Sequence, residues 1–153
     1  MLNSDYKDIL RNLLENNVRF LVVGAYAMSV YGYPRSTGDI DIWIDRSGDN
    51  PLRVHRALIA FGAPMANISV ETFAAVDVVF QIGVIPCRID MITTIDGVVF
   101  ESAFAAHKTF DVDNMMIPFI SVQDLIANKH AAGRPKDLAD IINLTRILQG
   151  DKP

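Results

Sequence analysis

The sequence predicts an α/β (α+β) domain in which helices flank a mixed sheet, and three observations support this class. An apolar run at 18–23, interrupted only by Arg19, ends at Gly24, where a short helical pattern begins. Isoleucine occupies every second position of 39–45, which is the period of a strand. Helical patterns stand at both ends of the chain. With 153 residues, half of them hydrophobic, the chain has the size and composition of a single domain spanning 1–153.

The first half of the chain is divided by distinct helix and strand signals. Ser4 can cap a helix that runs to about Asn16 with one apolar face. The apolar run at 18–23 suits a buried strand, and a short helix is expected at 25–31. Proline and glycine mark 33–38 as a loop. After the strand at 39–45, Pro51 opens a helix that Gly62 closes.

The second half is richer in strands and ends in two helices. Strands are expected at 78–82, 87–92 and 112–120, with a short helix at 70–75 and a strand-to-helix segment at 98–108. Ser121 and Asp124 have the spacing of a capping box, so C-terminal helices begin at about 121, and Gly133 ends the first of them. Pro135 starts the last helix, which runs to about 149. Its side chains available for packing are Leu138, Ile141, Ile142 and Ile147.

Bulk composition excludes several classes of protein. The net charge of -4 and the pI of about 5.2 argue against a broad basic surface for nucleic acid, although a local basic patch is compatible with both. Cys87 is the sole cysteine, so no intramolecular disulfide can form. The acidic start of the chain does not resemble a secretory signal, and no apolar run has the length of a membrane span. We therefore expect a soluble, cytoplasmic protein without membrane contact.

Three aspartates on two expected strands are the candidate metal ligands. Asp39 and Asp41 are two residues apart, so their carboxylates share a strand face and need a cation to offset their repulsion. Mg²⁺ favours such oxygen ligands and leaves positions for substrate phosphates. Asp90 interrupts another apolar strand, and its convergence on the pair would complete a two-ion site. The alternatives are an exposed acidic face for the pair, and an ion pair with Arg88 or an edge-strand charge for Asp90.

Candidate phosphate ligands come before the acidic strand in the sequence. Gly24 joins a buried strand to a helix N-terminus, whose free N–H groups suit phosphate, although an ordinary turn has the same pattern. Arg35, Ser36 and Thr37 precede the acidic strand. They could bind phosphate or ribose oxygens, or Arg35 could simply pair with a nearby acid.

A second group of charges surrounds the break between the last two helices. Lys129, Arg134 and Lys136 are three cations around one turn of an acidic protein, which suits a triphosphate. The simpler explanation for Lys129 is a charge that complements the helix dipole. Helix-dipole complementarity also accounts for Asp137 and Asp140 on the first turns of the final helix.

Taken together, these segments resemble the nucleotidyltransferase superfamily. The stretch from Phe20 through Gly24 to Asp39-Ile-Asp41 follows its pattern of an apolar strand, a glycine turn and Asp-x-Asp on the next strand. Asp90 stands where a third carboxylate is usual. Residues 125–140 look like the C-terminal helices of small prokaryotic members, which include proteins near toxin–antitoxin and abortive-infection systems. The resemblance covers roughly 18–148.

The resemblance implies a nucleotidyltransferase-like mixed sheet and a Mg²⁺- or Mn²⁺-dependent enzyme. Such an enzyme moves a nucleoside monophosphate from a nucleoside triphosphate to an acceptor, here a protein, an RNA end or a small molecule. Asp39, Asp41 and Asp90 would be the catalytic metal ligands, and Asp90 would also help to deprotonate the acceptor hydroxyl. The nucleotide-binding residues implied by the resemblance and the local charge are Gly24, Ala25, Arg35, Ser36, Thr37, Lys129 and Arg134.

Ala25 departs from the family pattern, because many active members have serine or glycine there. Alanine keeps the small size but offers no hydroxyl to a phosphate. A second hypothesis is therefore a catalytically inactive member, acting as a nucleotide sensor or as the partner-binding subunit of a toxin–antitoxin pair. A third is an RNA-binding module without chemistry, which the acidic charge disfavours.

Overall fold

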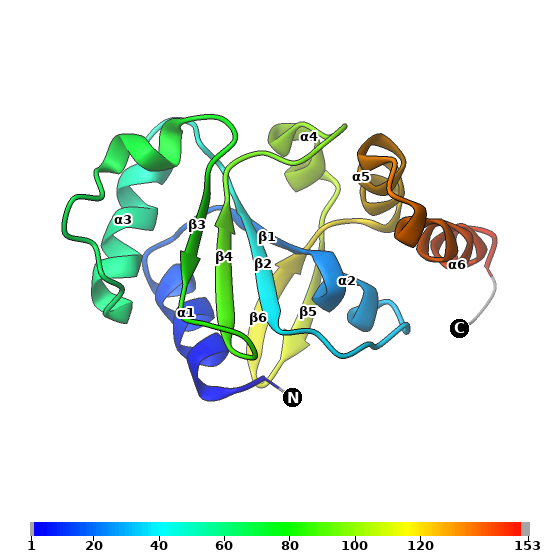
Figure 1. The fold of residues 1–153 in the computed structure, drawn as a ribbon, viewed down its shortest axis with the longest axis horizontal. Coiled ribbons are helices and arrows are strands. Elements are labelled where there is room, and N and C mark those ends of the chain that lie inside the picture. Colours follow the sequence, from blue (N-terminus) through cyan, green and yellow to red (C-terminus); the bar gives the residue numbers. More distant parts are fainter. Residues whose placement is uncertain (1, 151–153) are drawn as a thin grey trace.

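A mixed sheet of six strands forms the centre of the computed structural model, which describes residues 2–150 (Figure 1). The strand order is β3-β4-β2-β1-β6-β5. The two central pairings differ in direction, because β2 is parallel to β4 and antiparallel to β1. The α/β class with a mixed sheet is thereby confirmed. The strands are β1 (Phe20–Val23), β2 (Asp39–Ile44), β3 (Val79–Ile82), β4 (Arg88–Ile92), β5 (Lys108–Val112) and β6 (Met115–Phe119).

Helices occur where the sequence predicts them, with small shifts at the ends. The cap of the first helix is Asn3 and not Ser4, because the Asn3 side chain accepts a hydrogen bond from the Tyr6 N–H at 2.9 Å. The Ser121 cap is confirmed by the hydrogen bond from the Asp124 N–H. A 3₁₀ turn at Pro135–Asp137 precedes the last helix. The helices are α1 (Ser4–Glu15), α2 (Gly24–Val30), α3 (Asn50–Phe61), α4 (Phe100–Ala105), α5 (Val122–Ala132) and α6 (Leu138–Leu148), with a further 3₁₀ turn at Val70–Ala74.

The two faces of the sheet carry different side chains. Ile40 and Ile42 of β2 are fully buried and belong to the main core. As viewed in Figure 1, α1 lies behind β3 and β4 and packs against α3 at the left, whereas α2, α5 and α6 lie to the right of β2. Strand alternation turns Asp39 and Asp41 to the face opposite the isoleucines. Trp43 follows on that face, is 1% exposed and meets the Phe100 ring edge-on at 5.0 Å between centroids, so it is a core residue.

The final helix does not pack as the sequence predicts. Leu138 and Ile142 are 64% and 51% exposed, although the sequence predicts that both apolar side chains are available for packing. The buried residues of α6 are Asp140 and Leu144. The ion pairs of Asp140, described below, turn this polar side of the helix inward. Within residues 2–150, no helix is both long and apolar enough to cross a membrane.

Candidate active site

Three aspartates from two adjacent strands converge on one face of the sheet. The parallel register of β2 and β4 sets Asp41 beside Asp90 and Asp39 beside Arg88. Because paired residues share a face, all four side chains point to the same side. One carboxylate oxygen from each aspartate lies within 4.8 Å of the other two, which is close enough for one cation to bridge them. The convergence that the sequence predicts for Asp90 is therefore present.

Gly24 provides the space that the Asp41 carboxylate occupies. This residue begins α2 directly after β1 and has a left-handed φ of +69°. Its neighbour Val23 is the register partner of Asp41. A β-carbon at Gly24 would lie 2.2 Å from Oδ2 of Asp41, well inside van der Waals contact. The sequence predicts that this turn admits a phosphate. The structure adds that the Asp41 carboxylate occupies the space that a side chain at position 24 would fill.

The guanidinium of Arg88 bridges two of the three carboxylates. Its Nε donates to Oδ1 of Asp90 at 2.9 Å, and its Nη2 donates to Oδ2 of Asp90 at 3.2 Å and to Oδ2 of Asp39 at 3.0 Å. The ion pair between Asp90 and Arg88, which the sequence offers as an alternative to convergence, thus coexists with convergence. Within the described part of the chain, Asp41 makes no ion pair.

The three carboxyl groups consequently differ in their affinity for protons. Burial, together with the charges of Asp39 and Asp90, raises the pKa of Asp41 to about 7. Burial also raises the pKa of Asp90, although the hydrogen bond from Arg88 opposes the shift. Burial acts on Asp39 too, but the hydrogen bonds that it accepts from Thr37 and Arg88 outweigh burial and lower the pKa of Asp39. Asp41 is therefore the carboxyl group with the least compensation for its burial.

A pocket of about 510 Å³ opens beside this triad. Asp39 and Asp41 lie in its wall, and all seven residues expected to bind nucleotide line it as well. They come from the start of α2, the loop before β2, the end of α5 and the turn that follows it. The structure thus brings the predicted residues together, while their contact with a nucleotide stays a prediction. The lining also includes Ile92, Lys136, Asp137 and Asp140.

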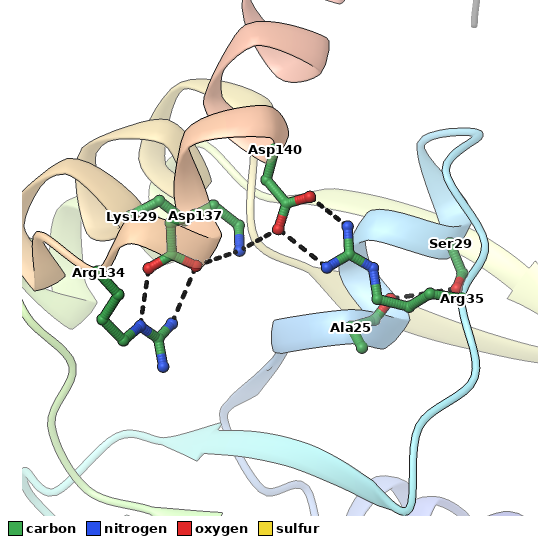
Figure 2. Close-up of polar contacts among 7 residues, drawn as sticks. All are labelled: Ala25, Ser29, Arg35, Lys129, Arg134, Asp137 and Asp140. Atoms are coloured by element: carbon green, nitrogen blue, oxygen red, sulfur yellow. Dashed lines mark hydrogen bonds and ion pairs between the residues drawn. The ribbon is translucent and has the colours of Figure 1, made fainter.

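Three cations that line the pocket, Arg35, Lys129 and Arg134, are held by two carboxylates of the C-terminal segment (Figure 2). Lys129 Nζ lies 2.9 Å from Oδ2 of Asp140 and 3.3 Å from Oδ1 of Asp137. Arg134 Nε lies 2.7 Å from Oδ2 of Asp137. Two guanidinium nitrogens of Arg35 contact the carboxylate of Asp140 from the other side. This network connects the loop before β2 to α5 and α6.

Burial of the network adds to two of the expectations from sequence. Asp137 and Asp140 stand at the start of α6, as the sequence predicts, but they are 2% and 5% exposed and form ion pairs, so the helix dipole is not their only partner. Lys129 is 6% exposed, so it is not a helix-end charge facing water. Burial tends to raise the pKa of both aspartates, but the hydrogen bonds and charges of Arg134, Lys129 and Arg35 outweigh it and lower both. The network is thus ionised as well as buried.

In the loop before β2, Thr37 orients a carboxylate of the triad and Ser36 is exposed to solvent. Thr37 donates its hydroxyl hydrogen bond to Oδ1 of Asp39 at 2.9 Å, which orients the first carboxylate. At the start of α2 the backbone oxygen of Ala25 accepts the Ser29 hydroxyl at 3.1 Å, as Figure 2 shows. Ala25 itself places only a methyl group at the pocket.

Comparisons with known proteins identify the family and a similar fold. Residues 2–152 match the profile of a family described as "nucleotidyl transferase of unknown function (DUF2204)". The chain belongs to this nucleotidyl transferase family. The fold is similar to the crystal structure of a "putative nucleotidyltransferase" from Thermotoga maritima, with a TM-score of 0.60 over 99% of this chain and 97% of that chain at 15% sequence identity. No protein of the curated set matches the chain significantly.

For this nucleotidyl transferase family member, sequence reasoning misses three groups at the site. It treats Arg88 only as a partner of Asp90, although a position two residues earlier on a strand already places Arg88 on the same face. It assigns Asp137 and Asp140 to a helix dipole, whereas their spacing of three residues on a helix indicates that they share a side. No local pattern, however, indicates that Arg35 lies against Asp140, 105 residues away.

Proposed function

We propose that this protein is a metal-dependent nucleotidyltransferase, which moves a nucleoside monophosphate from a nucleoside triphosphate to an acceptor hydroxyl. The proposal rests on three carboxylates that converge from adjacent parallel strands beside a pocket lined by cations. Membership of the nucleotidyl transferase family and the shared fold support it. The acceptor, whether protein, RNA end or small molecule, and a cytoplasmic location are parts of the same proposal.

The donor set of the triad fits Mg²⁺ or Mn²⁺. Carboxylate oxygens are the ligands that these ions prefer, and Asp39, Asp41 and Asp90 would supply them. Asp41 is the strongest support, because it is largely buried and lacks an ion-pair partner in the described chain. A bound divalent ion would neutralise charge on the α-phosphoryl group and on the pyrophosphate leaving group.

The protein's own residues would position the reactants and move one proton. The acceptor hydroxyl oxygen forms a bond to the α-phosphorus, and the bond from that phosphorus to the pyrophosphate oxygen breaks. Asp90, whose pKa is raised by burial, would receive the hydroxyl proton. Arg35, Lys129 and Arg134 would hold the triphosphate through charge-assisted hydrogen bonds.

The test is transfer of label from α-labelled triphosphates. Each common ribonucleoside triphosphate is incubated with the protein, Mg²⁺ or Mn²⁺ and a cell extract, and labelled product is resolved by size. We expect one triphosphate to label an acceptor, and Asp39→Asn and Asp41→Asn to abolish labelling. Asp8→Asn is the matched control, because it removes the same charge from an exposed pair with Arg11. Equal labelling by parent and triad variants would contradict the proposal.

The phosphate role of the cations is tested best at Arg134. Its side chain is 52% exposed, so truncation should leave the fold intact, unlike truncation of buried Lys129. Loss of one charge-assisted hydrogen bond, worth about 1.5–3 kcal/mol, should weaken Mg²⁺–triphosphate binding roughly ten- to a hundredfold. Calorimetric titration of Arg134→Ala measures this, with the exposed Arg56→Ala on α3 as control. Parent-like affinity in Arg134→Ala would assign this arginine to the ion-pair network alone.

A second candidate function follows from Ala25. This position supplies no hydroxyl to the pocket, and a member that binds nucleotide without transferring it would serve as a sensor or as the partner-binding subunit of a toxin–antitoxin pair. The two candidates give different results in the same experiments. Binding of Mg²⁺–triphosphate by calorimetry without any labelled product would favour the second candidate, and labelled product would exclude it.

A further inference from the structure

The guanidinium of Arg88 binds the carboxylate oxygens that a metal ion would need. Both oxygens of Asp90 accept hydrogen bonds from its guanidinium, and Oδ2 of Asp39 accepts a third. The remaining oxygen of Asp39 accepts the Thr37 hydroxyl. An ion that takes one oxygen from each aspartate must therefore take an Asp90 oxygen that already has a cation as its partner.

The backbone of Arg88 is held by hydrogen bonds, so only its side chain can move away from the triad. Its N–H donates to the Gly38 oxygen at 3.2 Å, and its own carbonyl oxygen accepts the Tyr6 hydroxyl at 3.0 Å. The ladder pairing with Asp39 then sets where the side chain starts. The side chain itself is 26% exposed, which leaves a route from the triad to solvent.

We propose that Arg88 is the resident counter-ion of the triad, and that a divalent metal ion binds there only by displacing its guanidinium. The inference rests on the proposed function, because it takes the triad as a metal site. Like charges a few ångström apart repel strongly in a partly desolvated site, so the ion and the guanidinium compete for Asp90 and Asp39. The competition weakens binding of a free ion. A metal that arrives with a triphosphate brings phosphate oxygens, which can accept the hydrogen bonds that Arg88 gives up.

The competition predicts an increase in metal affinity when a positive charge is removed. Mn²⁺ binding is measured without nucleotide, from the electron paramagnetic resonance signal of the free ion. We expect Arg88→Gln to bind Mn²⁺ roughly tenfold or more tightly than the parent, as removal of one nearby like charge implies. Arg56→Gln on α3 is the matched control, because it removes the same charge from an exposed site. It should leave the Mn²⁺ affinity unchanged.

A second variant keeps the inference testable if Arg88→Gln does not fold. Arg88→Lys keeps the charge but replaces the fork by a single ammonium group, which cannot hold both Asp90 oxygens and Asp39 in the same geometry. Its Mn²⁺ affinity should lie between those of the parent and Arg88→Gln. Circular dichroism checks that each variant is folded. An arginine that only supports the fold would not produce this order of affinities.

The outcomes separate this inference from the proposed function. Equal or weaker Mn²⁺ binding by folded Arg88→Gln and Arg88→Lys, compared with a parent that binds Mn²⁺, would overturn the role of Arg88 alone. Absence of Mn²⁺ binding in the parent and in every variant would overturn the metal site, and with it the proposed function. Tighter binding in Arg88→Gln supports the inference whether or not nucleotide transfer is detected.

Discussion

Substitution of Gly24 by alanine should disturb the triad through a single steric contact. The new β-carbon would meet Oδ2 of Asp41 at 2.2 Å and Cγ at 3.1 Å, so the carboxylate must rotate away from its partners. The left-handed backbone adds about 1–2 kcal/mol of strain for a non-glycine residue. Overpacking typically adds about 1–3 kcal/mol. We therefore expect Gly24→Ala to lower the free energy of unfolding by about 2–5 kcal/mol.

Gly48 supplies a control that separates strain from contact. It has a similar φ of +58°, but a β-carbon there would meet nothing within 4 Å. Gly48→Ala should therefore cost only the strain, about 1–2 kcal/mol. Urea unfolding measures both variants, and Mn²⁺ titration should show weakened binding for Gly24→Ala alone. In an Asp41→Ala background the two closest contacts disappear, so the excess cost of Gly24→Ala should shrink.

Two results would refute this reasoning. If Gly24→Ala cost no more than Gly48→Ala, the Asp41 carboxylate would not lie against the turn. If the excess cost persisted unchanged in the Asp41→Ala background, its source would be another contact of α2. Either result would remove the steric reason for glycine at the end of β1.

Three further predictions concern protonation and buried charge. Since the pKa of Asp41 is about 7 when folded and 3.8 in its reference state, the folded protein holds the extra proton between these values. Metal-free stability should thus fall as pH rises from about 4 to 7, by up to about 4 kcal/mol, and urea unfolding of Asp41→Asn should lack this fall. Lys129→Met leaves Asp137 and Asp140 buried with one cation each, and should cost about 3–5 kcal/mol in the same assay. The lowered pKa of Asp140 means that its contribution is lost as pH falls below 3.8, so the deficit of Asp140→Asn at pH 7 should diminish in acid.

Two of the three carboxylates of the triad could be placed together from sequence because their signal is local. Alternating isoleucines place Asp39 and Asp41 on one strand face, and this alternation is independent of the rest of the chain. The register that brings Asp90 beside Asp41 is set by pairing between strands about fifty residues apart. From sequence, only the family resemblance supplies that step.

The orientation of α6 could not be predicted from the local pattern of apolar residues. Its apolar positions suggest that Leu138 and Ile142 face the core, yet the buried side of the helix carries Asp140 and Leu144. The deciding partners are Lys129 on α5 and Arg35 in the loop before β2, both outside the helix itself. Charged side chains this deeply buried must be paired, so the ion pairs outweigh the burial of two apolar side chains.

Most charged side chains around the pocket are already paired, and this pairing favours a ligand that carries both signs. A purely anionic ligand would have to draw cations away from two buried carboxylates, and a free metal ion would have to displace a guanidinium from the triad. A metal–triphosphate complex would exchange partners on both sides, because its ion replaces one cation among the aspartates while its phosphates accept the released donors. The four cations that contact carboxylates at this site are Arg35, Arg88, Lys129 and Arg134. Mixed charge therefore favours the complex over either component alone, as the proposed reaction requires.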